Sequence, residues 1–278
     1  MKNIAISNIA WLQSEDDKMF EIMANLKVSL LEISPFRESA DKKVINNESA
    51  KNLKMRLYNY GIKIVSLQAL LYRFPELVIF QGKVTRAKTL NHLERVIDFA
   101  CEVGAKSLIF GSPKNKLRGK LDYDNAFTIA IDFFGKLAER AKLQQVSLCI
   151  EPTPTVYGSD FIRDTNETVA LLKAVNSSAL RLNLDIGSSI VNKENIEDII
   201  QNNIQYIGNV HISEPFLKMI TFNSLFHQRI ADKLNANSYN NNVSLEMLPQ
   251  TNKNVNGIYR TLIFIQKIYS NYEKNIRS

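Results

Sequence analysis

The sequence predicts a single α/β domain over residues 1–278 with the architecture of a (β/α)8 TIM barrel. Eight short apolar runs alternate with longer segments of helical periodicity. No linker or low-complexity stretch divides the chain, and 278 residues with 45% hydrophobic and 23% charged residues suit one barrel. A doubly wound open sheet is the rival architecture, but it would gather its ligand at one switch point.

The apolar runs are the expected strands, and each is short enough to cross a barrel wall once. They are Ile4–Ile9, Val28–Ile33, Ile62–Leu67, Ser107–Phe110, Ser147–Ile150, Arg181–Leu184, Ile207–Val210 and Val243–Leu245.

The segments between these runs are the expected helices. Ala87–Val103 and Asp122–Leu143 carry apolar residues at a spacing of three to four, which is typical of a helix with one buried face. Gly104 follows the first of them as a C-terminal capping glycine would. The polar residues of Asp164–Glu167 offer side chains to cap the helix expected over Thr168–Val175.

Composition restricts the class of function. With only Cys101 and Cys149, a disulfide framework is not expected, and the protein should be cytoplasmic. No signal-peptide pattern and no apolar run of about 18 residues is present, so no membrane partner is expected. The net charge of +7 permits nucleic-acid binding, but the lysines are scattered and we expect none. The basic segment Lys114–Lys120 is expected to be a solvated loop more than a phosphate anchor.

Four side chains suited to metal binding stand at the ends of four successive apolar runs. They are Glu151, Asp185, His211 and Glu246, and the interval between each pair is long enough for one strand-loop-helix unit. The carboxyl ends of parallel barrel strands meet at one mouth, where such side chains would converge. Three carboxylates and one imidazole suit one divalent metal ion, Mn²⁺, Mg²⁺, Co²⁺ or Zn²⁺.

A cation at this mouth would polarise the carbonyl and adjacent hydroxyl of a sugar and lower the cost of an enediolate. Two glutamates on non-adjacent strands, Glu151 and Glu246, would then flank the carbon whose proton moves. One would abstract the proton and the other would return it, so these two are the expected catalytic residues.

The same segments resemble the sugar phosphate isomerase/epimerase family, which has the xylose isomerase-like barrel and includes ketose 3-epimerases and inosose dehydratases. The resembling runs are Ile150-Glu151-Pro152, Leu184-Asp185-Ile186-Gly187, Val210-His211-Ile212-Ser213-Glu214 and Ser244-Leu245-Glu246-Met247. The resemblance implies that Glu151, Asp185, His211 and Glu246 are the metal ligands and that the substrate is a small carbohydrate. Ser188 stands where many members have a histidine, and no arginine follows in Glu214–Leu217, so the substrate contacts of the ketose epimerases do not carry over.

Six further residues are candidate substrate contacts, each with a structural alternative. Trp11 could stack on a sugar ring or pack at the barrel rim, and Gln68 could bind a hydroxyl or only close a strand. Glu214 could orient substrate or support a ligand, and His227 is expected to cap a helix or lie at the surface more than to touch substrate. The six candidates are Trp11, Glu32, Gln68, Tyr157, Glu214 and His227. The apolar segment Arg73–Phe80 could cover the mouth or form a contact in a homo-oligomer.

The expected function is a metal-dependent isomerase or epimerase of a sugar, sugar derivative or sugar phosphate, working by proton transfer next to a carbonyl. The alternative on the same site is a lyase or dehydratase acting on an inosose or 3-keto sugar. An enzyme resembling abasic-site endonucleases is less expected, because His92, His211 and His227 are too few for a zinc cluster. A catalytically silent barrel is the other minor alternative.

Overall fold

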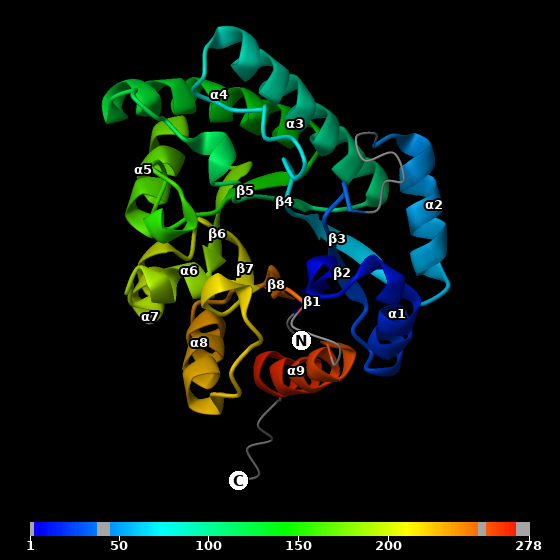
Figure 1. Ribbon diagram of the computed structural model, residues 1–278. Coiled ribbons are helices and arrows are strands. Elements are labelled where there is room, and N and C mark those ends of the chain that lie inside the picture. The colour runs from blue at the N-terminus through cyan, green and yellow to red at the C-terminus, as the bar shows by residue number, and fades with distance from the viewer. Residues whose placement is uncertain (1–2, 38–44, 250–253, 271–278) are drawn as a thin grey trace.

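The strands form a closed barrel in which every neighbouring pair is parallel and the spatial order is the sequence order, β1 to β8. The computed structural model describes residues 3–37, 45–249 and 254–270. β1 closes the barrel against β8, with Ile4 opposite Val243 and Ile6 opposite Leu245. Figure 1 looks into the barrel, with the strands at the centre and the helices in a ring around them. The predicted TIM barrel is confirmed.

The strands are β1 (Asn3–Ser7), β2 (Leu30–Ile33), β3 (Lys63–Leu67), β4 (Ser107–Phe110), β5 (Ser147–Ile150), β6 (Leu180–Asp185), β7 (Ile207–Ile212) and β8 (Asn242–Leu245). The helices are α1 (Asp16–Asn25), α2 (Asn47–Tyr58), α3 (Lys83–Val103), α4 (Tyr123–Leu143), α5 (Thr165–Val175), α6 (Ile186–Val191), α7 (Ile196–Asn203), α8 (Ser224–Ala236) and α9 (Asn254–Tyr269). Short 3-10 turns are η1 (Asn8–Ala10), η2 (Gln13–Glu15), η3 (Lys114–Lys116), η4 (Thr155–Tyr157) and η5 (Pro215–Leu217).

All eight expected strands are present, and the differences lie at their ends. β1 stops at Ser7 because the chain turns into η1, so Trp11 lies beyond the strand. The helix after β3 begins at Lys83, earlier than its apolar periodicity indicates, and ends at Gly104 in the left-handed conformation, with φ of 86°. The side chain of Asp164 caps α5 as expected, whereas Asp122, expected inside the helix over Asp122–Leu143, is instead the N-cap of α4.

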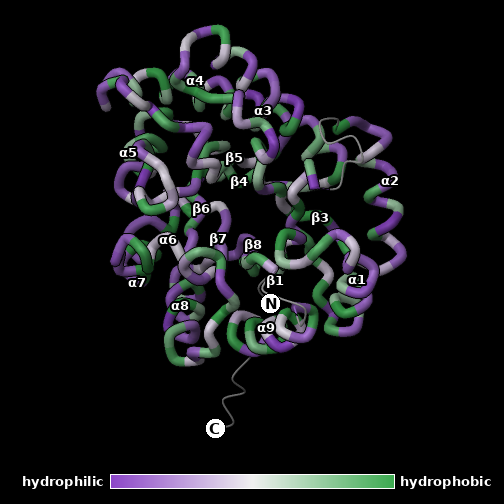
Figure 2. Tube along the Cα trace, in the orientation of Figure 1, coloured by the Kyte–Doolittle hydropathy of each residue, from purple (hydrophilic) through white to green (hydrophobic). Residues whose placement is uncertain are grey.

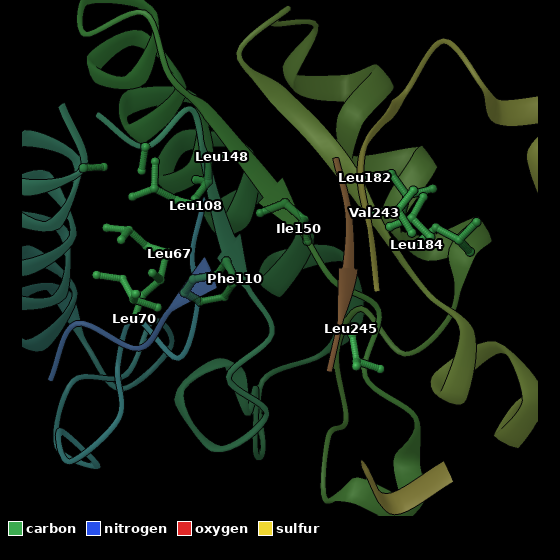
Figure 3. Close-up of a cluster of buried hydrophobic side chains, with 14 of the residues drawn as sticks. Leu67, Leu70, Leu108, Phe110, Leu148, Ile150, Leu182, Leu184, Val243 and Leu245 are labelled. Atoms are coloured by element: carbon green, nitrogen blue, oxygen red, sulfur yellow. The ribbon is translucent and has the colours of Figure 1, made fainter. Parts of the chain in front are cut away.

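Alternation along the strands separates an apolar outer face from a polar inner face. Figure 3 shows the apolar side chains, among them Ile150, Leu182, Leu184, Val243 and Leu245, which belong to one buried cluster with the inner faces of the helices. Figure 2 shows hydrophilic and hydrophobic residues alternating along the surrounding helices, as expected for helices with one face in water.

The inner faces of the strands carry polar side chains that bond to one another across the barrel. Ser66 and Ser244 both donate to Glu32, and Asn209 donates to Asn183. All five side chains are buried. The barrel interior is therefore a hydrogen-bonded polar layer below the mouth, and this layer determines how the site is supported.

The apolar segment after β3 packs inside the protein. Phe74, Leu77, Val78 and Ile79 are all buried, and the ring of Phe74 lies 4.8 Å from that of Phe36. These side chains therefore stabilise the loop and do not form the exposed cover or subunit contact that the sequence suggested. Within the described part of the chain, no helix has the length and apolar character to cross a membrane.

Candidate metal centre

The structure brings the four proposed ligands together at the carboxyl end of the barrel. Asp185 is the last residue of β6 and His211 lies near the end of β7, while Glu151 and Glu246 directly follow β5 and β8. One potential ligand atom from each residue lies within 4.8 Å of the others. Asp185, His211 and Glu246 are buried, and Glu151 is partly exposed toward the mouth. Successive side chains point to opposite faces of a strand, so each ligand points into the barrel while the residue before or after it faces the apolar layer.

His211 lies at the centre of the cluster. Its Nδ1 is 3.0 Å from Oε2 of Glu246 and 3.3 Å from Oε2 of Glu151, and its Nε2 is 3.0 Å from Oε1 of Glu32. Burial lowers the pKa of His211, but the carboxylates of Glu246 and Glu32 raise that pKa well above its ordinary value. When the imidazole is neutral with its proton on Nε2, that proton lies on the side of Glu32 and the Nδ1 lone pair faces the other three ligands.

Glu32 supports His211 from below. It is fully buried, and it accepts hydrogen bonds from Ser66 at 2.6 Å and Ser244 at 3.2 Å. Burial alone would raise the pKa of Glu32, but the charge of His211 and the hydrogen bonds of the two serines outweigh this effect. The pKa of Glu32 is therefore lowered from its ordinary value. An ionised carboxylate on this side of the imidazole fixes the ring orientation and raises its basicity.

A pair of buried asparagines supports the cluster from the side. Asn183 Nδ2 donates to Oε2 of Glu151 at 2.5 Å and lies 3.2 Å from Nδ1 of His211. Asn209 donates in turn to Oδ1 of Asn183 at 2.8 Å. Each asparagine lies two positions before a proposed ligand on the same strand, Asp185 or His211, and so shares its inner face.

Asp185 is held by Ser188 in α6 and by Ser213, which directly follows β7. Its Oδ1 accepts the backbone N–H of Ser188 at 2.6 Å, and its Oδ2 accepts the hydroxyl of Ser213 at 2.6 Å. Burial raises the pKa of Asp185, and repulsion by Glu151 adds to the rise. Burial also raises the pKa of Glu246 to about 7, although His211 opposes it. Three crowded carboxylates are costly when all are ionised, and a divalent cation offsets that cost.

Two residues outside the cluster hold Glu151. A Cβ at Gly111 would lie 2.4 Å from Oε1 of Glu151, so the missing side chain makes room for this carboxylate. The buried Lys116 donates to the backbone oxygen of Glu151 at 2.9 Å and to the hydroxyl of Thr153 at 2.9 Å. Burial lowers the pKa of Lys116 to about 7, partly offset by Glu151 and Glu167.

A cavity of about 470 Å³ opens beside the cluster at the ends of β3, β4, β5 and β8. Glu151 and Glu246 form part of its wall, together with Gln68 and the loop residues Arg73 and Lys114. This volume suits a small metabolite. The donor set beside it, three carboxylates and an imidazole, fits a divalent cation such as Mn²⁺, Mg²⁺, Co²⁺ or Zn²⁺.

The other candidate substrate contacts lie in different places. Gln68 is buried, donates to Ser7 and lines the cavity. Tyr157 lies at the rim, where its hydroxyl accepts the N–H of Phe216 at 2.9 Å. Burial raises the pKa of Tyr157, and Asp185, Glu151 and Glu246 add to the rise. Glu32 lies below the cluster, as described above.

Glu214 turns away from the cluster, because its Oε1 accepts hydrogen bonds from the backbone N–H and the hydroxyl of Thr221. Trp11 is buried in the wall of the protein, where its indole N–H donates to Asp16 at 2.7 Å. His227 is also fully buried, with Nδ1 3.0 Å from the hydroxyl of Tyr269. It lies inside the first turns of α8, so the expectation of a surface histidine is wrong.

The expectation of a solvated basic loop over Lys114–Lys120 is also wrong in part. Lys116 is fully buried, and Arg118 bonds to the backbone oxygens of Asp160 at 3.1 Å and Leu121 at 2.7 Å. Lys114, Gly119 and Lys120 are exposed. Lysine is rarely buried, so composition gave no reason to expect Lys116 as an internal hydrogen-bond donor.

The residues that sequence reasoning missed are the supporting ones: Ser66, Gly111, Lys116, Asn183, Asn209, Ser213 and Ser244. A signal existed for the two asparagines, since each is a polar residue inside an apolar run, in phase with a proposed ligand. No comparable signal existed for Gly111 or Lys116, because their roles depend on contacts between different loops.

Comparison with known proteins supplies the context of this site. A family model described as "Xylose isomerase-like TIM barrel" matches residues 20–266. No curated protein matches the sequence. A D-psicose 3-epimerase structure determined in the presence of D-fructose is similar, with 14% identity, a TM-score of 0.80, and coverage of 97% of this chain and 99% of that one.

Two further structures have nearly the same similarity. D-psicose 3-epimerase with D-tagatose from Clostridium cellulolyticum H10 has 15% identity and a TM-score of 0.80, covering 97% of this chain and 99% of that one. The apo form of 3-keto-D-glucoside 4-epimerase from E. coli has 15% identity and a TM-score of 0.79, covering 96% of this chain and 100% of that one. Such low identities show the shared fold alone.

Proposed function

This chain belongs to the xylose isomerase-like TIM barrel family, and from that premise and the geometry of the metal centre we propose that it is a divalent-metal-dependent isomerase or epimerase of a sugar or sugar derivative. The observation that carries the proposal is the convergence of Glu151, Asp185, His211 and Glu246 beside a cavity of about 470 Å³. Similar structures include keto-sugar epimerases determined with D-fructose and D-tagatose, which supports a carbohydrate substrate.

In the proposed reaction, Glu151, Asp185, His211 and Glu246 hold the cation. A divalent cation held there would supply a Lewis acid beside a carbonyl and its neighbouring hydroxyl, which would make the adjacent C–H more acidic. Glu151 and Glu246 both line the cavity and come from non-adjacent strands, so they face the substrate from different sides. One removes the proton from the carbon beside the carbonyl, and the other returns a proton to that carbon or its neighbour.

The residues around the catalytic pair keep these carboxylates in place. Asn183 holds Oε2 of Glu151, and Gly111 leaves room for the same carboxylate. Gln68 lines the cavity with an amide, which supports recognition of a substrate hydroxyl. Positioning within a fraction of an ångström is what proton transfer at carbon requires, so these supports belong to the proposed mechanism.

Metal uptake tests the proposal first. The purified protein should bind Mn²⁺, Co²⁺ or Zn²⁺ at micromolar concentrations, measured by titration calorimetry and elemental analysis. Glu246→Gln should lose most of this affinity because it removes one charged ligand, whereas Glu139→Gln, an exposed acid on α4, should retain it. A wild-type protein that takes up none of these ions contradicts the proposal.

Deuterium incorporation then distinguishes the reaction type. Incubating the metal-loaded protein with keto-sugars in deuterated water should place solvent deuterium on one carbon without loss of mass from the skeleton. Loss of water or of a leaving group would replace the isomerase with the lyase or dehydratase alternative. An abasic-site endonuclease fits poorly, because His92 and His227 lie in α3 and α8 and are absent from the ligand cluster.

A further inference from the structure

Two basic side chains line the cavity beside the metal centre, and the proposed mechanism uses neither. Arg73 comes from the loop after β3 and Lys114 from η3 after β4, while the other charged residues in the wall are Glu151 and Glu246. Neither base forms an ion pair within residues 3–37, 45–249 and 254–270. The guanidinium of Arg73 lies over the ring of the neighbouring Tyr72, 5.4 Å from its centroid, a contact that does not neutralise its charge, so both charges can meet an anionic ligand.

The loops that carry Arg73 and Lys114 are hydrogen-bonded to each other right next to these two residues. Asn115, which follows Lys114, is buried and donates its side-chain amide to the backbone oxygens of Phe74 at 2.9 Å and Leu77 at 2.7 Å. Its own backbone oxygen accepts the N–H of Ile79 at 3.0 Å. Phe74 follows Arg73, so a single buried side chain fixes the backbone of both bases relative to each other.

The third residue of η3 fixes the same turn to the metal centre. Lys116 is fully buried and donates to the backbone oxygen of Glu151 and to Thr153. The three consecutive residues Lys114, Asn115 and Lys116 thus have separate partners: the cavity, the loop after β3, and the loop after β5. Lys114 is the member left exposed at the cavity, and its backbone position relative to Glu151 is set by hydrogen bonds.

We propose that Arg73 and Lys114 form an anion subsite, and that the substrate is a sugar derivative with a carboxylate or phosphate at the end remote from the reacting carbon. This rests on the proposed function. Among the described residues, Glu151 and Glu246 are ion-paired with His211 and with neither base, so Arg73 and Lys114 keep their positive charges for a ligand with or without a cation in the cluster. The guanidinium of arginine matches either oxyanion with paired hydrogen bonds, and lysine adds a point charge.

The first experiment compares three ligands by titration calorimetry on the Mn²⁺-loaded protein: a neutral keto-sugar, its terminal phosphate ester and its terminal carboxylate. At least one anionic ligand should bind about tenfold more tightly than the neutral sugar, because it forms two partly exposed ion pairs, with Arg73 and Lys114. The anionic ligand that binds more tightly shows whether the subsite prefers phosphate or carboxylate. Arg73→Met with Lys114→Met should remove the advantage and leave neutral-sugar affinity unchanged. Lys120→Met, an exposed base of the same segment outside the cavity wall, should keep it.

The second experiment separates this subsite from the metal-dependent function. Inorganic phosphate is titrated into chelator-treated wild type and into the double variant, so direct binding of phosphate to a metal is removed. Wild type should bind phosphate and the double variant should not, whether or not metal uptake succeeds. Equal affinity for neutral and anionic sugars, or equal weakening by Lys120→Met, would overturn the subsite, while failed metal uptake with intact phosphate binding would overturn only the proposed function.

Discussion

At the scale of single residues, the environment of His211 decides what the cluster can do. The imidazole has Glu32 on one nitrogen and Glu151 and Glu246 on the other. An imidazole can serve as a metal ligand only when its ligating nitrogen is unprotonated, so the residue that keeps the proton on the far nitrogen is part of the site. In the proposed metal site, Glu32 would therefore contribute to metal affinity without lying at the mouth.

Replacing Glu32 by glutamine should test this contribution. Glu32→Gln keeps the size and removes the charge that orients the Nε2 proton, so metal affinity should fall by about 10- to 100-fold with the fold retained. Titration calorimetry measures the affinity, and circular dichroism checks the fold. Asp16→Asn is a matched control, because Asp16 is equally buried but bonds to Trp11 and Arg37 outside the cluster. Unchanged affinity in Glu32→Gln would contradict the assigned role.

The four cluster residues were predictable because each follows or ends an apolar run, and parallel strand ends converge. The supports of these residues were harder to foresee. The sequence predicts Glu32 as a substrate contact, because its partner His211 is far away in sequence and a support of the cluster cannot be distinguished from a substrate contact without the fold. The predicted first strand, Ile4–Ile9, runs past the end of β1 at Ser7, because the turn η1 is not visible in the hydrophobic pattern.

At the scale of elements, the end of β4 and the turn that follows it position Glu151. β4 ends at Phe110, and Gly111 then passes so close to Glu151 that a Cβ would contact its carboxylate. The contact is with the flexible end of a side chain, so a substitution would displace the carboxylate while leaving the backbone in place.

Gly111→Ala should therefore weaken metal binding without unfolding the protein. The methyl group would lie 2.4 Å from Oε1 of Glu151 and would push this carboxylate from the cluster. Gly135→Ala is the control, since nothing lies within 4 Å of a Cβ there and its position inside α4 favours alanine. Metal titration measures the affinity of both variants, and thermal unfolding checks that both are folded. Equal metal affinity of Gly111→Ala and wild type would refute the assigned role of Gly111.

The order of the elements followed from the sequence more completely than the loops did. Apolar runs and helical periodicity indicated every strand and most helix ends, because burial of one face imposes a period on each element. The loops after β3 and β4 follow no period. Phe74 and Lys116 are held by hydrogen bonds and packing between loops, and contacts of that kind leave no local pattern in the chain.

At the scale of the whole molecule, the charges of the cluster couple stability to pH. Burial raises the folded-state pKa of Glu246 to about 7, from an ordinary value of 4.5. The unfolded chain therefore releases this proton at lower pH than the folded protein does. The elevated pKa of His211 acts in the same direction, because a base that binds its proton more tightly when folded loses stabilisation as pH rises.

The metal-free protein should accordingly lose stability as the pH rises from 4.5 to about 7. Thermal unfolding in the presence of a chelator, followed by circular dichroism at several pH values, measures the slope. Glu246→Gln removes one of the titrating groups and should flatten the curve in this window. A midpoint that rises steadily over the same range in the metal-free wild type would show that other groups dominate.

Cation binding should stabilise the whole barrel, because the ligands come from four strands that must be folded to meet. At a free metal concentration of about 100 times the dissociation constant, the free energy of unfolding should increase by about 2.7 kcal/mol. For a chain of this size, that raises the melting temperature by roughly 5 °C. Differential scanning calorimetry with Mn²⁺ and with chelator measures the shift, which should be nearly absent in Glu246→Gln.

The turn at Lys114–Lys116 has a consequence for how the family can diversify around this site. The three adjacent residues contact three different parts of the protein. Inserting or deleting one residue here would shift the register, so that each contact would fall to a side chain that cannot make it. Substitution is therefore the tolerated route of change in this stretch, and gaps are not. In alignments of close homologues, insertions should accumulate elsewhere on the rim, and the spacing from Gly111 to Lys116 should stay constant.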